Sequence, residues 1–154
     1  MNDVVQSSST NVMTPNRWED TPLAGLNVGG STEFGALRFV PEAFWKRAHK
    51  GSYNSRSDRV GHPGCSLGLH PKQTLSAVMY VLHGTSGKSK AAVCVRDVDS
   101  QGWATYFGGL PAVPIQAKFW RNDCRPCLKP RLSAAETAQV KNLFRKKRKI
   151  WGVL

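Results

Sequence analysis

Acidic residues are scarce in this sequence. Its 154 residues include ten Asp and Glu against 22 Lys and Arg, so the formal net charge is +12. From residue 33 onward there are three glutamates, and one of them, Glu136, stands where a helix cap is expected. Paired carboxylates for acid–base catalysis are therefore few, and the H-E-x-x-H motif of zinc-dependent hydrolases is absent. We expect a protein that is not an enzyme.

Cysteine and long apolar runs are also in short supply. Four cysteines in a chain of this length do not predict a disulfide scaffold. The longest apolar run lies within residues 77–82, which is far too short to cross a membrane. Residues 1–5 lack the basic and apolar regions of a signal peptide. We therefore expect an intracellular protein, in the nucleus or cytoplasm or associated with a virion.

The charge is divided unevenly along the chain. Residues 1–33 carry one Arg against four acidic residues, a net charge of −3. Residues 34–154 carry the other 21 Lys and Arg against six acidic residues, a net charge of +15. A folded body this positive, with a pI near 10, predicts a polyanionic partner.

The hydrophobic pattern predicts an α+β fold in one small domain. Residues 1–33 are rich in Ser, Thr, Asn and Gly and are predicted to be a flexible arm, followed by a mixed body over 34–132. The body should hold an antiparallel sheet with short helices. We expect strands at 36–40, 91–98, 103–107 and 115–119, a helix at 42–47 and a long loop over 50–70. Residues 72–83 fit either a helix or a central strand.

The clearest predicted element is a basic amphipathic helix over residues 133–154. Ser133 and Glu136 have the spacing of a capping box. Apolar residues then recur on one stripe of the helical wheel, while five consecutive cations occupy 145–149. Lys147 falls inside the apolar stripe, so its side chain must reach out along it or the helix must loosen there.

Basic residues with interleaved aromatics predict a nucleic-acid surface. Cations along a helix neutralise phosphates, and an exposed aromatic such as Tyr53 stacks on unpaired bases. RNA is preferred over DNA because no helix with base-reading side chains is evident. The predicted binding residues are Arg38, Lys46, Arg47, Lys50, Tyr53, Arg56, Arg59, Lys88, Lys90, Lys141, Arg145, Lys146, Arg148 and Lys149. The run at 146–149 also has the form of a nuclear localisation signal.

The Cys124-Arg125-Pro126-Cys127 segment allows two interpretations besides ordinary thiols. In the first, Cys124 and Cys127 bind one zinc ion together with Cys65 and either His70 or His62. In the second, they form a redox pair, because residues 119–127 resemble the active-site segment of thioredoxins. Thioredoxins place most of their central sheet after this motif, whereas here only 27 residues follow Cys127.

Together these patterns predict a non-enzymatic nucleic-acid-binding protein, such as a nucleocapsid-type, viral accessory or ribonucleoprotein component. Two alternatives stay open. One is a small redox or metal-dependent enzyme that uses Cys124 and Cys127, or the Asp97 and Asp99 pair. The other is a protein whose basic C-terminal helix docks on an anionic membrane surface or a partner. The apolar face of that helix also predicts contact with a second copy of the chain.

Overall fold

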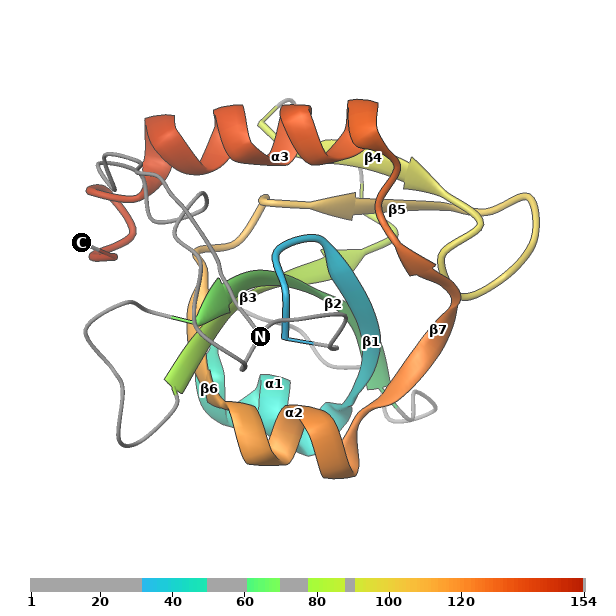
Figure 1. The fold of residues 1–154 in the computed structure, drawn as a ribbon, viewed down its shortest axis with the longest axis horizontal. Coiled ribbons are helices and arrows are strands. Elements are labelled where there is room, and N and C mark those ends of the chain that lie inside the picture. The colour runs from blue at the N-terminus through green and yellow to red at the C-terminus, as the bar shows by residue number, and fades with distance from the viewer. Residues whose placement is uncertain (1–31, 50–60, 70–77, 88–90, 154) are drawn as a thin grey trace, which may run out of the picture.

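The chain folds into a seven-stranded antiparallel sheet with three helices, as a computed structural model shows for residues 32–49, 61–69, 78–87 and 91–153 (Figure 1). This confirms the α+β prediction. The elements in chain order are β1 (Ala36–Pro41), α1 (Glu42–Ala48), β2 (Gly61–Leu69), β3 (Val78–Thr85), β4 (Val93–Arg96), β5 (Ala104–Phe107), β6 (Val113–Gln116), α2 (Ala117–Asp123), β7 (Arg125–Arg131) and α3 (Ala134–Lys147).

The strands are ordered β4-β5-β3-β2-β1-β7, and β6 also pairs with β3. One edge of β3 is shared, because its first half pairs with β6 and its last two residues pair with β5. The sheet curls until its two ends meet: the Lys129 N–H of β7 donates to the Val98 carbonyl, just after β4, at 3.1 Å. The curl lets a small sheet enclose part of its own core.

The sheet has a different core on each face. Side chains alternate between the faces of a strand, so Leu37 and Leu82 lie on one face while Val40 and Val81 lie on the other. The first face packs against α3 and the β4–β5 hairpin, and the second packs against α1 and α2. Figure 1 shows α3 along the top and the two shorter helices at the bottom.

Strand β2 corrects the prediction of a loop that ran through residues 61–69. Its glycines suggested a loop, but Gly64 is a position where aromatic rings approach the strand backbone. A Cβ atom at Gly64 would lie 3.2 Å from the Trp120 ring and 3.4 Å from the Trp45 ring. Both tryptophans therefore lie directly against the strand. The rest of the predicted loop, 50–60 and residue 70, lies outside the described residues.

The strand predicted at 115–119 from alternating apolar and polar residues extends beyond the observed end of the strand. The strand ends at Gln116, and α2 begins at Ala117 because Ala117, Trp120 and Cys124 bury one helical face against the sheet. The ambiguous stretch becomes strand β3 from Val78 onward. The predicted strands at 36–40, 91–98 and 103–107 and the helix at 42–47 are confirmed, with the second and third strands somewhat shorter than expected.

The predicted N-terminal arm lies outside the described residues except for its last two positions. Thr32 is buried, and its carbonyl accepts a hydrogen bond from the Ser66 hydroxyl at 3.0 Å. Glu33 forms an ion pair with Arg131 of β7. Thr32 and Glu33 are therefore attached to the body. Within the described part of the chain, no helix has both the length and the apolar character needed to cross a membrane.

Candidate nucleic-acid interface

Helix α3 begins with the predicted capping box. The Ser133 hydroxyl accepts a hydrogen bond from the Glu136 N–H at 3.1 Å, and the Glu136 carboxylate accepts one from the Ser133 N–H at 2.8 Å. Partial burial alone would raise the pKa of Glu136. The bonds from Ser133 and from the Lys129 ammonium, 2.9 Å away, outweigh burial and hold that pKa below its usual value.

The apolar stripe of α3 packs on the protein's own sheet. Val140 and Phe144 are fully buried, and the Phe144 ring lies 6.5 Å from that of Phe34. A Cβ atom at Gly108 would collide with Leu143, so the β5–β6 connection runs close beneath the helix. The face that was expected to contact a second copy is thus largely occupied inside one chain. A homo-oligomer stays a prediction that needs another surface.

The chain after α3 returns to the core. Helical hydrogen bonds continue from Arg148 N–H to Phe144 O and from Trp151 N–H to Lys147 O, both at 2.9 Å. Gly152, with φ of +77°, then reverses the chain, and the Val153 N–H bonds to Arg148 O at 2.7 Å. Val153 is only 2% exposed. The five cations therefore lie between two anchored segments.

We call residues 145–149 the C-terminal cation array. Arg145, Lys146 and Lys149 are exposed, while Lys147 and Arg148 are half-buried. The half-burial of Lys147, the last residue of α3, agrees with its expected place on the apolar stripe. The Arg148 guanidinium lies 6.0 Å from the Phe144 ring centre. Glu136, the one carboxylate of α3, precedes the array by more than two turns, so the helix itself offers no nearby countercharge.

The predicted binding residues do not form one surface. Lys46 and Arg47 are exposed on α1, which covers the opposite face of the sheet from α3. Lys141 lies on α3, with its ammonium 5.6 Å from the Phe34 ring centre. Six residues lie outside the described ranges: Lys50, Tyr53, Arg56, Arg59, Lys88 and Lys90.

Arg38 has a structural role that the sequence did not reveal. Its guanidinium donates to the carbonyls of Trp120, Arg121 and Cys124, at the C-terminal end of α2. The last carbonyls of a helix lack partners within the helix and carry partial negative charge. Arg38 therefore fastens α2 to β1, and its charge is largely used inside the fold.

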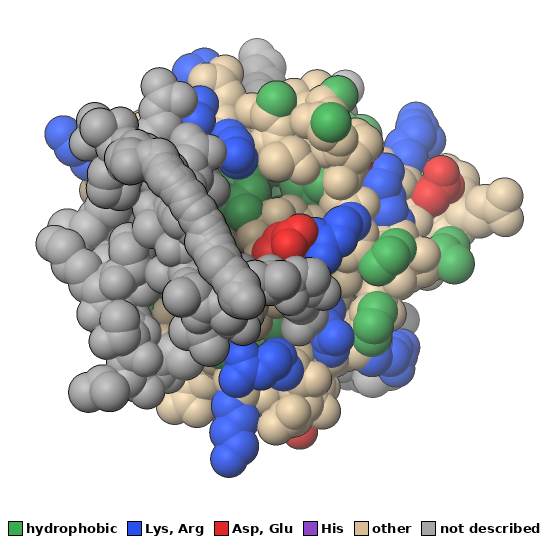
Figure 2. All heavy atoms as spheres, viewed as in Figure 1, with side chains coloured by type: hydrophobic (Ala, Val, Ile, Leu, Met, Phe, Trp, Pro, Cys, Tyr) green, Lys and Arg blue, Asp and Glu red, His purple; other side chains and the backbone are tan. Residues whose placement is uncertain are grey.

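Strand β7 and helix α2 bring further cations to the surface, and these were not among the predicted binding residues. Lys118, Arg121 and Arg125 are exposed, and the Arg125 guanidinium lies 4.8 Å from the Phe39 ring centre. Prolines and cysteines obscured this strand in the sequence. In Figure 2, Lys and Arg outnumber Asp and Glu on the described part of the visible face, and they are spread over several elements. The basic surface is broad, and the C-terminal cation array is its densest segment in sequence.

The cysteines of the predicted zinc site lie in different surroundings. Cys65 and Cys127 belong to the core beneath α3, whereas Cys124 belongs to the core on the other face. Burial raises the pKa of Cys124 and of Cys127 to about 12 and raises that of Cys65 further, so the thiols stay protonated. Among the residues described, no three His, Cys, Asp or Glu side chains are arranged to hold a metal ion. His70 lies outside those residues.

The pair Cys124 and Cys127 also sits in a different order from the thioredoxin segment. In thioredoxins the motif opens a helix, whereas here it follows the end of α2 and leads into β7. Both thiols are buried. The raised pKa of each thiol opposes the thiolate that redox exchange requires. Nothing in this geometry favours redox use.

Three histidines form a buried cluster with Trp45, which the sequence analysis did not anticipate. The His83 ring stacks on Trp45 at 4.1 Å between ring centres, and His49 stacks on His83 at 5.2 Å. His62 meets His83 edge-on at 4.8 Å, and its Nε2 lies 3.3 Å from a Glu42 oxygen. Spacing along the chain gave no signal, because the rings come from α1 and the residue after it, from β2 and from β3.

The two stacked imidazoles of the cluster, His83 and His49, carry no positive charge at neutral pH. Burial, with smaller contributions from His62 and His49, lowers the pKa of His83 to about 2. Burial also lowers the pKa of His49. His83 and His49 therefore stay neutral, and the exposed cations described above are Lys and Arg. No protein-family model, no curated protein and no solved structure matches this chain.

Proposed function

We propose that this protein binds nucleic acid without catalysing a reaction, and that the C-terminal cation array is the main contact with the phosphate backbone. The observation that carries the proposal is the anchoring of this array at both ends, by Phe144 in α3 and by Val153 after the Gly152 turn. Five like charges in sequence repel one another. Held on a folded surface, exposed cations such as Lys146 and Lys149 can meet a partner without first being ordered.

The partner chemistry follows from the charge and its setting. A helix C-terminus favours cations, but that effect is confined to the last turn and is about 0.3–1 kcal/mol per charge. This effect does not account for five consecutive cations. A chain of phosphates would neutralise the array and release its counterions, which drives binding without sequence selection. RNA is proposed over DNA for the reason that the sequence offers, that no helix with an evident set of base-reading side chains is present.

The test is a salt series with a matched control. Affinity for labelled single-stranded and duplex RNA and DNA is measured by fluorescence anisotropy for the unchanged protein and for Lys146→Gln with Lys149→Gln. The control, Lys46→Gln with Arg47→Gln, removes the same charge from α1, on the other side of the sheet. We expect the α3 variant to bind all sequences more weakly and to lower the log–log salt slope by about 1.4, from roughly 0.7 per phosphate on a single strand.

The control should lose less affinity than the α3 variant. Equal losses in the two variants would show that overall charge, and not the array, governs binding. An unchanged protein that binds none of the four nucleic acids, or binds with an affinity that salt does not alter, would refute the proposed function itself.

One observation favours a second candidate, an anionic membrane surface. Ile150 is 75% exposed and follows directly on the exposed Lys149. An apolar side chain among cations is the combination that interfacial segments use. Sedimentation with phosphatidylserine vesicles, compared with phosphatidylcholine vesicles, distinguishes the two candidates. Membrane docking requires binding to the anionic vesicles that falls when Ile150 is changed to Ser, whereas binding to nucleic acid should not depend on this side chain.

A further inference from the structure

Trp103 is a large apolar side chain held in an exposed position. It is 67% exposed and lies at the end of the loop that joins β4 to β5. The loop is closed by its own hydrogen bonds: the Asp97 N–H donates to Trp103 O at 3.0 Å, and the Gly102 N–H donates to the Asp97 carboxylate at 2.5 Å. The positive φ angles of Asp97 and Gly102, 61° and 82°, make this tight closure feasible.

The same loop is fastened to the rest of the sheet. Val98 is fully buried, and its carbonyl accepts the Lys129 N–H of β7. The Arg96 guanidinium also donates to Gly102 O at 3.4 Å. The indole is therefore presented from a braced loop, and binding a flat ring to it would require little further ordering.

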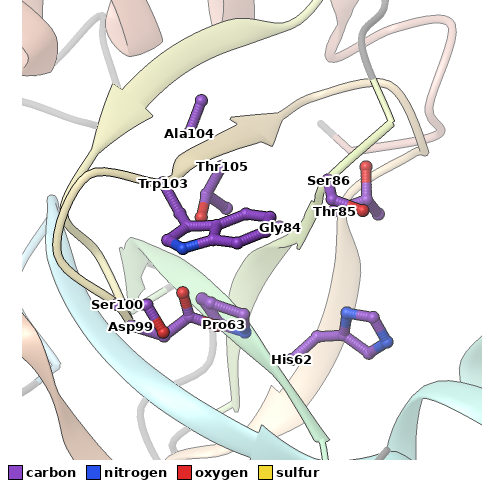
Figure 3. Close-up of a pocket in the computed structure, with 10 residues that line it drawn as sticks. All are labelled: His62, Pro63, Gly84, Thr85, Ser86, Asp99, Ser100, Trp103, Ala104 and Thr105. Atoms are coloured by element: carbon purple, nitrogen blue, oxygen red, sulfur yellow. The ribbon is translucent and has the colours of Figure 1, made fainter.

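A cleft of about 270 Å³ lies beside Trp103, close to the lower end of the size range for small-molecule sites, roughly 300 Å³. In Figure 3 the indole lies across the middle of the cleft, with Asp99 and Ser100 on one side and Thr85 and Ser86 on the other. Thr105 of β5 also contributes to the lining. The cleft thus combines one aromatic face with hydroxyl groups and one carboxylate.

We infer that this cleft binds an unpaired guanine base, stacked on Trp103 and hydrogen-bonded to Asp99. Every base offers a flat face for stacking. Guanine alone presents two adjacent donors, N1–H and N2–H, which match the two oxygens of a carboxylate. Adenine and cytosine place an acceptor beside their amino group, and uracil places acceptors on both sides of its N–H. The hydroxyls of Ser86 and Ser100 supply donors for the O6 and N7 acceptors of guanine.

This inference deepens the proposed function, since it assigns a base-recognition site to the nucleic acid that the array would bind. The two sites lie apart: in Figure 1 the β4–β5 loop projects at the right, while α3 leads to the C-terminus at the left. Phosphate contact and base contact can therefore be removed separately. The array supplies affinity for any sequence, and the cleft supplies a preference for guanine.

The test uses the four nucleoside 5′-monophosphates at equal ionic strength with the full-length protein. Dissociation constants are taken from ligand-observed NMR titrations, which do not depend on tryptophan emission. We expect guanosine monophosphate to bind at least tenfold more tightly than the other three. Trp103→Ala should weaken its binding about tenfold or more, Trp103→Phe should retain much of it, and Asp99→Asn should abolish the preference for guanine.

Controls separate this site from the array. Lys146→Gln with Lys149→Gln should leave the binding of guanosine monophosphate unchanged within twofold, although it weakens RNA binding. Leu128→Ala, at another exposed apolar side chain, should change neither. Equal binding of the four nucleotides, or guanosine monophosphate binding that survives Trp103→Ala, would overturn the inference. Salt-dependent RNA binding without any mononucleotide binding would overturn it while leaving the proposed function standing.

Discussion

The two faces of the sheet are stabilised by different kinds of contact. The face under α3 packs Leu37, Leu82 and Phe144 against one another, and α3 turns its cations outward. The face under α1 and α2 instead stacks flat rings, with Trp45 against His83. A core built from Leu and Phe has no group that titrates near neutral pH, whereas stacked imidazoles must stay neutral to stay buried. The two faces should therefore respond to different changes in the solution.

The largest effect should come from removing one anchor of each face. Trp45→Ala and Phe144→Ala each empty a fully buried site and should lower the free energy of unfolding by about 3–5 kcal/mol. Urea denaturation of both variants measures this loss. Trp103→Ala, at an exposed ring, is the matched control and should cost less than about 0.5 kcal/mol. Loss of less than 1 kcal/mol at Trp45 would mean that the ring stack does not stabilise its face.

The second effect separates the faces by pH. In the folded protein the pKa of His83 is lowered to about 2, whereas its value in the unfolded chain is 6.5. The neutral imidazole therefore makes its full contribution to the free energy of unfolding above pH 6.5, and this contribution is lost progressively as the pH falls below 6.5. By pH 5 the loss should be about 2 kcal/mol, at roughly 1.4 kcal/mol per pH unit. The lowered pKa of His49 acts in the same direction. Urea denaturation at pH 7, 6 and 5 gives the dependence.

A variant sharpens this prediction. His83→Phe keeps a flat ring against Trp45 but cannot be protonated, so the decline between pH 7 and pH 5 should become shallower. Phe144→Ala, which is less stable but keeps all three histidines, should decline as steeply as the unchanged protein. A decline that is equally steep in His83→Phe would locate the pH sensitivity elsewhere.

The smallest effect concerns the face under α3. Ser133→Ala removes the hydroxyl that caps the helix and should cost about 1 kcal/mol in unfolding free energy. Ser133→Asp offers a carboxylate at the same position and should recover most of the loss. The pH dependence between 7 and 5 should be the same in both variants, because the histidines lie on the other face. A changed pH slope would show that the two faces are coupled.

The sequence was informative where a contact is local. The capping box of Ser133 and Glu136, the helix after Pro41 and several strands follow from residues close together in the chain. Strand β2 was missed because its glycines suggest a loop, although one of them, Gly64, makes room for Trp45 and Trp120 from distant segments. The histidine cluster was missed for the same reason. Such contacts depend on strand register, which no local pattern specifies.

In the candidate site, too, the local features could be predicted from the sequence, whereas the contacts between distant segments could not. A run of cations at 145–149 is visible in the sequence, but its anchoring by Gly152 and Val153 is not. Arg38 was assigned to the surface on charge alone, whereas β1 directs it to the end of α2. Trp103 was predicted as the first residue of a strand, whereas it lies just before β5, at the end of a loop closed by Asp97 and Gly102, and is exposed.

The pairing of β1 with β7 has a consequence for how the protein is made. Ala36, near the start of the body, pairs with Arg131, near its end, so β1 has an unpaired edge until most of the chain has left the ribosome. Contacts so distant in sequence slow folding, and an open strand edge invites pairing with other chains. Strand β7, which is synthesised last, contains Pro126 and Pro130. A proline has no N–H with which to extend a ladder of hydrogen bonds, so β7 is less prone to pair with another chain. During synthesis, the edge of β1 that β7 later covers is therefore a place where a nascent chain is exposed to misassembly.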